Sequence, residues 1–380
     1  MLDWLIIGGG IHGTHLARVL ERAGNSLRIL DPRPNLLDAW DRSTANVGMS
    51  HLRSPIAHDL DVGQLSLHHF ADAQPDHRLG WFMGPWRCPD RGVFRRHAAW
   101  LCEQSGLEDR HLRAKVLGLD ARHDRVLVET DRGELIARRV VLAIGRPTLA
   151  LPTWLPPRSR ATHPFDPEFT PTLADGQRAV IVGGGISAVQ LALLWAARAP
   201  GRVTLVARRP PTIAELDANP RWFRPARVRG FARLPLAGRR ALLRAERQRG
   251  SIPERVARRL RRALARGRLE LRVAEVDHAN ERVDGRGHSV VLTEGEAFEV
   301  DRIVTATGFC EGARADALLE SIAGRLGLAR DPLGVPIIDE SLRWHARLHV
   351  SGALAELALG PLAANIAGAR LAAPRLVGLD

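Results

Sequence analysis

Residues 5–31 read LIIGGGIHGTHLARVLERAGNSLRILD. The stretch opens on a short apolar run, which is typical of a fully buried parallel strand. Glycines follow at G-x-G-x-x-G spacing, and apolar residues then recur at helical spacing from Leu16 to Ala23. A second apolar run, from Leu27 to Leu30, ends at Asp31. The order strand, glycine loop, helix, strand and acid predicts a dinucleotide-binding unit.

The glycines and the acid of this unit have distinct physical roles. Gly8 makes the tight turn, Gly10 lets the backbone approach a pyrophosphate, and Gly13 lets the helix pack on the strand. The helix N-terminus offers free N–H groups and the positive end of its dipole to phosphates. Asp31 lies where a carboxylate accepts hydrogen bonds from ribose hydroxyls. The alternative is a glycine-rich turn in an ordinary α/β unit.

Length and composition indicate a globular chain with room for two domains, since it has 380 residues and 45% hydrophobic content. No apolar run reaches the ~20 residues of a membrane span, and the chain starts directly in a predicted core strand, so we expect no membrane partner and a cytoplasmic location. The net charge is +13, but Lys115 is the only lysine, which indicates an arginine-rich composition bias rather than nucleic-acid binding. Three widely spaced cysteines form no C-x-x-C pair, and we expect no metal site.

The opening motif recurs later in the chain. A strand at 179–182 leads into Gly183, Gly185 and Ala188, followed by a helical pattern and a second strand at 203–206. This strand ends in Arg208 and Arg209 instead of an acid. Arginine at this place pairs with a 2′-phosphate, whereas an acid repels it, so the second unit favours NADPH and the first suits FAD. The alternative is that both arginines are simply exposed side chains of an arginine-rich chain.

The two units suggest an order of domains. Residues 146–176 are rich in proline and are predicted to cross between domains, and residues 349–370 read as a strand, a glycine turn and a helix that return to the first domain. We therefore expect an α/β fold of two Rossmann-like domains, with the NADPH domain inserted in the FAD domain. The expected boundaries are 1–174 for the first part of the FAD domain, 175–300 for the NADPH domain and 301–380 for the return segment. The stretch 32–89 reads as irregular.

Several segments resemble the N-hydroxylating flavin monooxygenases, the lysine and ornithine hydroxylase family. The resemblance covers most of the chain and lies in these segments: Trp40 with Gly48-Met49 and His58-Asp59-Leu60; Pro89, Arg91, Phe94, His97 and Trp100; Gly183-Gly184-Gly185-Ile186-Ser187-Ala188; Ala218-Asn219-Pro220; Ala306-Thr307-Gly308-Phe309; and Gly360-Pro361 with Asn365. His97 stands where the family has tyrosine. The resemblance implies cofactor contacts by Trp40, Met49, Ser187, Gly308, Gly360, Pro361 and Asn365. The glycines that follow the strands at 140–144 and in the return segment, Gly145 and Gly352, join this set.

The substrate side departs from the family. The family lysine that holds the substrate carboxylate is replaced by His58, or its role has moved to Arg53, and a second family asparagine is lost around 250–252. We expect Arg53 to anchor an anionic group, with loop bracing as the alternative. His58 is expected to orient substrate or flavin and to titrate in a useful range, or else to be a buried hydrogen-bonded histidine. Asn219 is expected to contact nicotinamide or substrate, although Asn-Pro is also an ordinary turn.

The resemblance implies an NADPH- and O2-dependent monooxygenase that N-hydroxylates a small amine or amino acid through a flavin hydroperoxide. Such chemistry needs a dry pocket, to which Trp40 and Met49 would contribute unless they are merely core residues. One alternative is an NADPH-dependent flavin reductase or oxidase without oxygen insertion, which the missing lysine favours. Another is a flavin-binding redox sensor. The residues leave the substrate and the oligomeric state open.

Overall fold

The computed structural model describes residues 1–145, 148–155, 163–283, 285–314 and 316–378, so parts of the predicted proline-rich crossover lie outside the described residues. Within these ranges the first sheet has eight strands in the order β18-β19-β8-β1-β2-β5, with β6 and β7 continuing from β8. Its strands are β1 (Leu2–Ile7), β2 (Leu27–Asp31), β5 (His111–Arg113), β6 (Val116–Ala121), β7 (Val126–Thr130), β8 (Gly133–Leu142), β18 (Arg343–His345) and β19 (Leu348–Val350). β1 pairs in parallel with β2 and β8, and its residues from Trp4 to Ile7 are buried, as the apolar run predicts.

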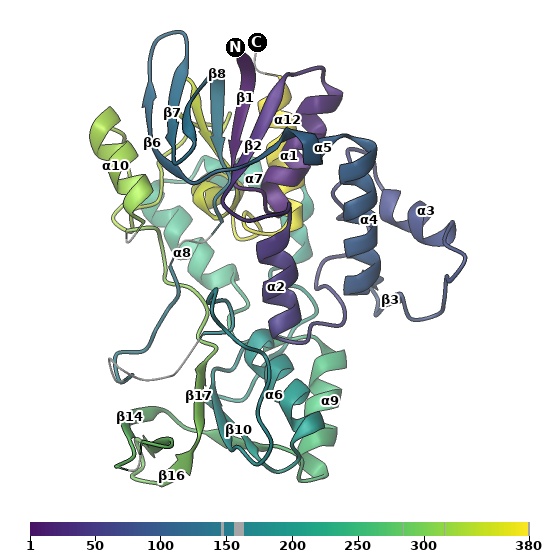
Figure 1. The fold of residues 1–380 in the computed structure, drawn as a ribbon, viewed down its shortest axis with the longest axis vertical. Helices are drawn as coiled ribbons and strands as arrows, with labels where there is room; N and C mark the ends of the chain where they lie inside the picture. Colours follow the sequence, from purple (N-terminus) through teal and green to yellow (C-terminus); the bar gives the residue numbers. More distant parts are fainter. Residues whose placement is uncertain (146–147, 156–162, 284, 315, 379–380) are drawn as a thin grey trace.

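The second sheet lies in the lower half of Figure 1, below the first. Its four strands are all parallel and follow the order β13-β10-β9-β17. These strands are β9 (Ala179–Val182), β10 (Val203–Ala207), β13 (Glu270–Val273) and β17 (Arg302–Thr305), and an antiparallel sheet of β14 (Val276–Glu281), β15 (His288–Leu292) and β16 (Ala297–Val300) lies beside them. The chain then returns to β18 and β19 in the first sheet, so the predicted α/β class with one domain inserted in the other is confirmed. β17 still belongs to the second sheet, so the proposed boundary between residues 300 and 301 precedes this strand rather than follows it.

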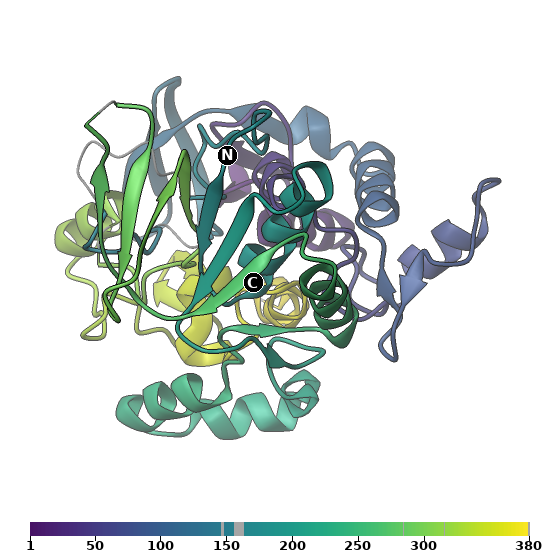
Figure 2. The same ribbon diagram turned by 90° about the horizontal axis from the view of Figure 1, so that it is seen from below.

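Helices cover both sheets. They are α1 (Ile11–Arg22), α2 (Asp38–Asn46), α3 (Ser66–Asp72), α4 (Arg91–Gln104), α5 (Leu107–Arg110), α6 (Ile186–Arg198), α7 (Pro225–Ala232), α8 (Leu236–Glu246), α9 (Glu254–Ala265), α10 (Ala317–Leu326), α11 (Glu356–Leu359) and α12 (Ile366–Val377), with 3-10 turns η1 (Pro220–Phe223) and η2 (Gly352–Ala355). α1 and α12 lie side by side at the first sheet, and α6 and α9 pack together at the second (Figure 1). Seen from below, the second sheet lies in front, and α3 projects to one side (Figure 2).

The stretch 32–89 is not irregular throughout, which corrects that prediction. It contains α2 and α3, and the two-residue strands β3 (Phe82–Met83) and β4 (Cys88–Pro89) pair with each other. Side chains from this stretch and from α4 form a separate small core that includes Leu67, Trp81 and Phe94. α2 and α3 are too short for their apolar residues to show a helical period in the sequence. Packing against α4 stabilises both helices.

The segment from η1 to α8 belongs to the core of the first domain, although it falls inside the predicted NADPH domain. Trp222, Val228, Phe231 and Leu243 are buried in the same hydrophobic cluster as β1 and α12. The second domain keeps its own cluster around α6 and β9. The inserted part of the chain therefore contacts both nucleotide-binding units.

A buried ionic cluster holds α8 against the first domain. Glu356 accepts from the guanidiniums of Arg240 and Arg247, and Arg240 also pairs with Asp331. The carboxylates are almost fully buried, with exposed side-chain fractions of 6% for Glu356 and 2% for Asp331. Burial would raise the pKa of Glu356, but the charges and hydrogen bonds of Arg247 and Arg240 outweigh it, and the pKa is lowered. The carboxylate is therefore ionised and contributes to stability at neutral pH.

We expect Glu356→Gln to lower the free energy of unfolding at pH 7 by about 1–3 kcal/mol, because it leaves two partly buried arginines undercompensated. A depressed carboxyl pKa contributes stability that is complete above the ordinary glutamate pKa and is lost as pH falls through the folded-state pKa. Urea titrations of both proteins should therefore differ most near neutral pH and converge in acid. An equal difference at both ends of the pH range would contradict the assignment.

Candidate functional site

The first glycine loop follows β1 and opens α1. Gly8 has φ +110°, and a Cβ built there would lie 2.5 Å from the carbonyl oxygen of Ala143. A Cβ at Gly13 would lie 1.7 Å from the carbonyl oxygen of Gly8. Gly10 differs, because it caps α1 with extended backbone and a Cβ there would meet nothing within 4 Å. Gly8 and Gly13 are thus required because any side chain would clash with the protein's own backbone. Gly10 instead leaves space for a phosphate-sized group at the N-terminus of α1.

Asp31 ends β2 beside this loop and is buried. One carboxylate oxygen accepts from the N–H of Gly9 at 2.7 Å. The other accepts from the backbone N–H of Arg33 at 2.9 Å and lies 3.4 Å from its guanidinium. These contacts fix the carboxylate at the carboxyl edge of the sheet, where its remaining lone pairs are available to ribose hydroxyls. The pairing with Arg33 was not foreseen from the sequence.

The second glycine loop repeats the geometry of the first. Gly183 has φ +148°, and a Cβ there would lie 2.4 Å from the carbonyl oxygen of Ala306. Gly185 caps α6, and a Cβ there would meet nothing within 4 Å. Ala188 is fully buried under the helix, and Ser187 is half-buried in its first turn. Both sheets therefore present an open helix N-terminus at the carboxyl ends of their parallel strands, where α/β folds bind nucleotides.

Arg208 and Arg209 follow β10 at the same edge and are exposed. Arg208 is 83% exposed, with its Nε 3.9 Å from a carboxylate oxygen of Glu275. Arg209 donates from Nη2 to the carbonyl oxygen of Arg249 at 3.1 Å. Neither guanidinium is buried in a rigid network, so both can turn to a nearby anion.

His12, between Gly10 and Gly13 in the first turn of α1, is a residue beside this site that sequence reasoning missed. Its Nε2 lies 3.1 Å from the carbonyl oxygen of Asn365, and its Nδ1 lies 2.8 Å from the hydroxyl of Ser351. Because a carbonyl only accepts, Nε2 carries the hydrogen and Nδ1 accepts from Ser351. Burial lowers the pKa of His12 to about 4, so the ring is neutral. It ties the glycine loop to Asn365, which caps α12, and its ring lies beside Gly352. A histidine within a glycine motif was the available signal.

Other predicted cofactor residues lie at the end of α11 and after strands of both sheets. Gly360 has φ +81°, and a Cβ there would lie 2.5 Å from the ring of Trp222, while Pro361 beside it is buried. Gly145 and Gly308 follow β8 and β17 with φ of +78° and +82°, and a Cβ at either would meet nothing within 4 Å. Gly145 and Gly308 therefore allow tight turns at the same sheet edges as the two glycine loops.

Trp40 and Met49 are both partly buried. The ring centroid of Trp40 lies 5.0 Å from that of Phe94, and Met49 packs on the same small core. This geometry favours the core alternative for both residues. A Cβ at the neighbouring Gly48 would lie 3.2 Å from the side chain of Leu194 on α6, so this segment contacts the second domain.

Arg53 is the clearest correction among the predicted site residues. Its guanidinium donates to the carbonyl oxygens of residues 214–216 at 2.6–3.2 Å, to the hydroxyl of Ser251 at 2.9 Å and to a carboxylate oxygen of Asp217 at 2.8 Å. Its side chain is only 8% exposed. A guanidinium has five N–H donors, and because Nη1 also donates to the carbonyl oxygen of Ser251 at 3.4 Å, all five face an acceptor. Arg53 therefore braces a loop, which was the alternative, and does not extend to an anionic substrate.

His58 and Asn219 lie at either end of η1. His58 contacts Phe223 edge-on, with ring centroids 4.6 Å apart. Burial lowers the pKa of His58 to about 4, and the charge of Arg370 adds to this effect, so the expected titration in a useful range is wrong. The Oδ1 of Asn219 accepts from the N–H of Arg221 at 3.0 Å, as a cap of the turn. Asn219 is exposed, and the structure shows its turn-forming role.

Because His58 stays neutral, we expect it to contribute no ionisation to the pH dependence of NADPH oxidation between about pH 6 and 9. The profiles of the wild-type protein and His58→Gln should have the same shape, even if their heights differ. The rate of NADPH oxidation across this pH range tests the prediction. A limb near pH 6.5 that disappears in the variant would contradict it.

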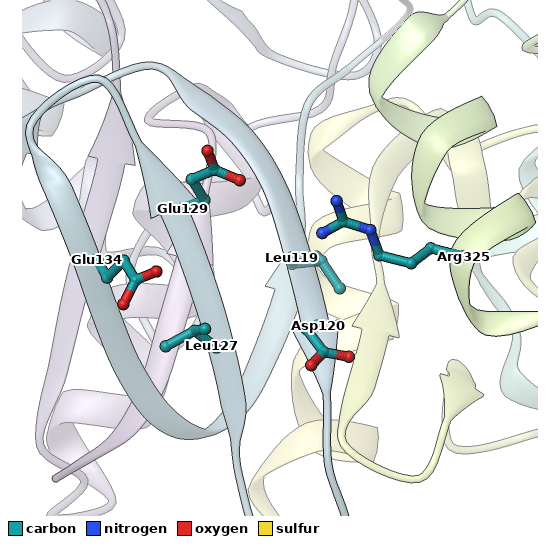
Figure 3. Close-up of a pocket in the computed structure, with 6 residues that line it drawn as sticks. All are labelled: Leu119, Asp120, Leu127, Glu129, Glu134 and Arg325. Carbon is teal, nitrogen blue, oxygen red and sulfur yellow. The ribbon is translucent and has the colours of Figure 1, made fainter.

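A separate groove of about 360 Å³ lies on the first sheet, away from both glycine loops. Figure 3 shows Glu129 and Glu134 on neighbouring strands and Arg325 reaching over from α10. The groove holds no residue of the predicted site. Across the described ranges, no cluster of histidine, cysteine and carboxylate side chains could hold a metal ion, and no helix is long and apolar enough to cross a membrane.

Comparison with known proteins identifies similar chains. A family model described as L-lysine 6-monooxygenase/L-ornithine 5-monooxygenase matches residues 87–311, and an FAD-NAD(P)-binding model matches residues 5–147. An ornithine N-hydroxylase of Kutzneria sp. 744, solved with reduced FAD, NADP+ and L-ornithine, is 19% identical with a TM-score of 0.77, over 99% of this chain and 98% of that one. No curated protein sequence matches this chain.

Two further structures have the same fold over nearly their full lengths. The cadaverine monooxygenase of the desferrioxamine pathway of Erwinia amylovora, bound to FAD, is 17% identical with a TM-score of 0.78, over 100% of this chain and 94% of that one. The ornithine hydroxylase of Pseudomonas aeruginosa is 19% identical with a TM-score of 0.76, over 100% and 98%. The chain therefore shares the overall fold of these three enzymes.

Proposed function

The chain belongs to the L-lysine 6-monooxygenase/L-ornithine 5-monooxygenase family, and we propose that it hydroxylates the nitrogen of a small primary amine with FAD, NADPH and O2. The observation that carries the proposal is the pair of open helix N-termini, at Gly10 and Gly185, each following a parallel strand of its own sheet. The first loop lies beside a carboxylate and the second beside two arginines. This contrast matches one nucleotide with a bare ribose and one with a 2′-phosphate.

The residues of the first loop fit FAD. The N–H groups at the start of α1 would hold the pyrophosphate, and Asp31 would accept from the ribose hydroxyls. Asn365 at the start of α12 directs a second helix N-terminus toward the same edge, and His12 holds it there. Bound FAD supplies the chemistry of electron acceptance from NADPH and of oxygen activation. The protein supplies orientation and shelter from water.

The residues of the second loop fit NADPH. Its phosphates would lie at the start of α6, next to Gly185 and Ser187. Arg208 and Arg209 would pair with the 2′-phosphate, since both guanidiniums are exposed at the carboxyl end of β10. The free state of the cysteines Cys88, Cys102 and Cys310 suits a reducing compartment, in which NADPH is available.

The amine would lie where the two domains meet, beside η1. His58 and Phe223 come together there, and Trp86 approaches Phe223 edge-on at 6.4 Å. A neutral His58 places no positive charge against an ammonium group. Aromatic rings at this junction also keep water from the reacting atoms.

One observation favours a second function. The cation expected to hold a substrate carboxylate, Arg53, is fully engaged by the chain itself. An enzyme without an amine substrate would consume NADPH and release hydrogen peroxide, as an NADPH oxidase does. The two functions differ in the fate of oxygen and not in the cofactors.

The deciding experiment measures products per NADPH consumed. Purified enzyme with FAD and NADPH is supplied in turn with L-ornithine, L-lysine, cadaverine and no amine, and hydroxylamine product and peroxide are quantified. We expect at least one amine to accelerate NADPH oxidation and to yield hydroxylamine in near-stoichiometric amount. If every amine gives the same rate and only peroxide, the hydroxylase proposal is overturned and the oxidase is supported.

A further inference from the structure

Two arginines cross between the domains in opposite directions. Arg53, from the first domain, donates to the backbone carbonyls of residues 214–216 in the inserted region. Arg255, from α9 of the second domain, donates from Nη2 to the carbonyl oxygens of His51 and Leu52 at 3.1 and 2.8 Å. Arg255 thus binds residues 51–52, directly before Arg53, and Arg53 binds Ser251, four residues before Arg255. We call this pair the reciprocal clamp.

The reciprocal clamp is connected to the first glycine loop. Asp217 accepts from Arg53 through one carboxylate oxygen and from the side-chain amide of Asn365 through the other, at 3.1 Å. The backbone carbonyl of Asn365 in turn accepts from His12 in the glycine loop. Polar contacts therefore run without interruption from the clamp to the predicted FAD pyrophosphate site.

It is also connected to the second glycine loop. Ser251 accepts a hydrogen bond from Arg53 and lies in β12 (Ser251–Ile252). β12 pairs with β11 (Thr212–Ile213), which follows Arg208 and Arg209 closely in the chain. Arg209 donates to the carbonyl of Arg249, two residues before Ser251. The reciprocal clamp is therefore linked to both predicted cofactor sites. Asp217 and Asn365 connect it to the FAD site, and the segment 249–251 connects it to the NADPH site.

We propose that Arg53 and Arg255 are positioning residues that set the spacing of the two cofactor sites for electron transfer from NADPH to FAD. In that step a hydride leaves the nicotinamide ring of NADPH and is taken up by the ring system of FAD. The products are NADP+ and the two-electron-reduced flavin anion, with no further reactant. Such a transfer needs reacting atoms about 3–3.5 Å apart, and a misplacement of about 1 Å costs on the order of 100-fold in rate. Planar guanidiniums suit the task, because several donors in a fixed plane resist rotation. The inference rests on the proposed function only for the identity of the two cofactors.

The test follows flavin reduction by NADPH in the FAD-loaded enzyme without oxygen or amine. Arg53→Gln and Arg255→Gln should each reduce flavin about 10- to 100-fold more slowly at saturating NADPH, with NADPH affinity changed by less than about threefold. Reduction by dithionite, which needs no docked nicotinamide, should be unchanged. NADPH deuterated at the transferred position should show a full primary isotope effect. Arg262→Gln, on the exposed side of the same helix α9, should behave as wild type.

The outcomes separate positioning from general stabilisation. If both variants keep the wild-type rate at saturating NADPH, the proposal is overturned. It is also overturned if slower reduction by NADPH is matched by an equal slowing with dithionite, since that result indicates damage to the flavin site. If Arg53→Gln does not fold, Arg255→Gln alone decides, because Arg255 makes fewer contacts: two backbone carbonyls, a hydrogen bond with Cys88 and the charge of Glu215. The assay contains no amine, so a failure to hydroxylate amines would leave its result intact.

Discussion

Gly10→Ala should bind FAD on the order of 100- to 10,000-fold more weakly than the wild-type protein, while its apoprotein unfolds at the same urea concentration. The backbone at Gly10 has φ −80° and ψ −166°, which alanine adopts freely, and a Cβ there would meet no protein atom within 4 Å. The methyl group would instead occupy the space through which a pyrophosphate approaches the N–H groups of α1. Losing two charge-assisted hydrogen bonds at about 1.5–3 kcal/mol each gives the expected range.

Two neighbouring variants make this prediction specific. Gly13→Ala would place a Cβ 1.7 Å from the carbonyl oxygen of Gly8, so it should destabilise the apoprotein as well as weaken FAD binding. Gly185→Ala is the equivalent of Gly10→Ala in the second loop, and it should weaken NADPH while FAD stays bound. Fluorescence titration of apoprotein with FAD and urea unfolding without FAD measure the two quantities. Unchanged FAD affinity in Gly10→Ala would show that the pyrophosphate lies elsewhere.

These glycines illustrate what the sequence can predict. The turn at Gly8 and the helix that starts at Gly10 depend on residues close together in the chain, and a local pattern is sufficient to identify them. The same holds for Gly183 and Gly185, so the spacing of glycines and apolar residues is enough to locate both nucleotide-binding units. The same pattern locates Asp31 at the end of β2 and Arg208 and Arg209 after β10.

The role of Arg53 shows where local patterns fail. Its partners lie more than 160 residues away in the chain, in a segment that the sequence assigned to the other domain. Likewise, Trp222 and Phe231 look like part of the inserted domain, but burial against the first core determines their position. The pKa of His58 depends on burial, which a sequence does not show. Each of these features depends on contacts between distant segments.

Coenzyme preference provides the second large effect. Replacing both Arg208 and Arg209 by glutamate should lower the preference for NADPH over NADH by about 30- to 1,000-fold, because two pairs with the 2′-phosphate are lost and two repulsions are gained. Both arginine side chains are exposed, so solvent screens their charges. Each arginine–phosphate pair should therefore contribute a free energy at the lower end of the range for charge-assisted hydrogen bonds. The measurement is the ratio of kcat/KM for the two coenzymes, with flavin reduction as the signal.

A control with the same change in net charge separates direct pairing from long-range attraction. Arg198 and Arg202 lie at the opposite edge of the same sheet, at the end of α6 and just before β10. If only the net charge of a strongly basic chain attracts NADPH, glutamate at these two positions should weaken it as much as glutamate at Arg208 and Arg209 does. If Arg208 and Arg209 contact the 2′-phosphate, the control double variant should keep the NADPH preference of the wild-type protein within about twofold. Raising the salt concentration should narrow any remaining difference between the control variant and the wild-type protein. Equal losses in the two double variants would rule out a direct contact and leave the exposed-arginine alternative.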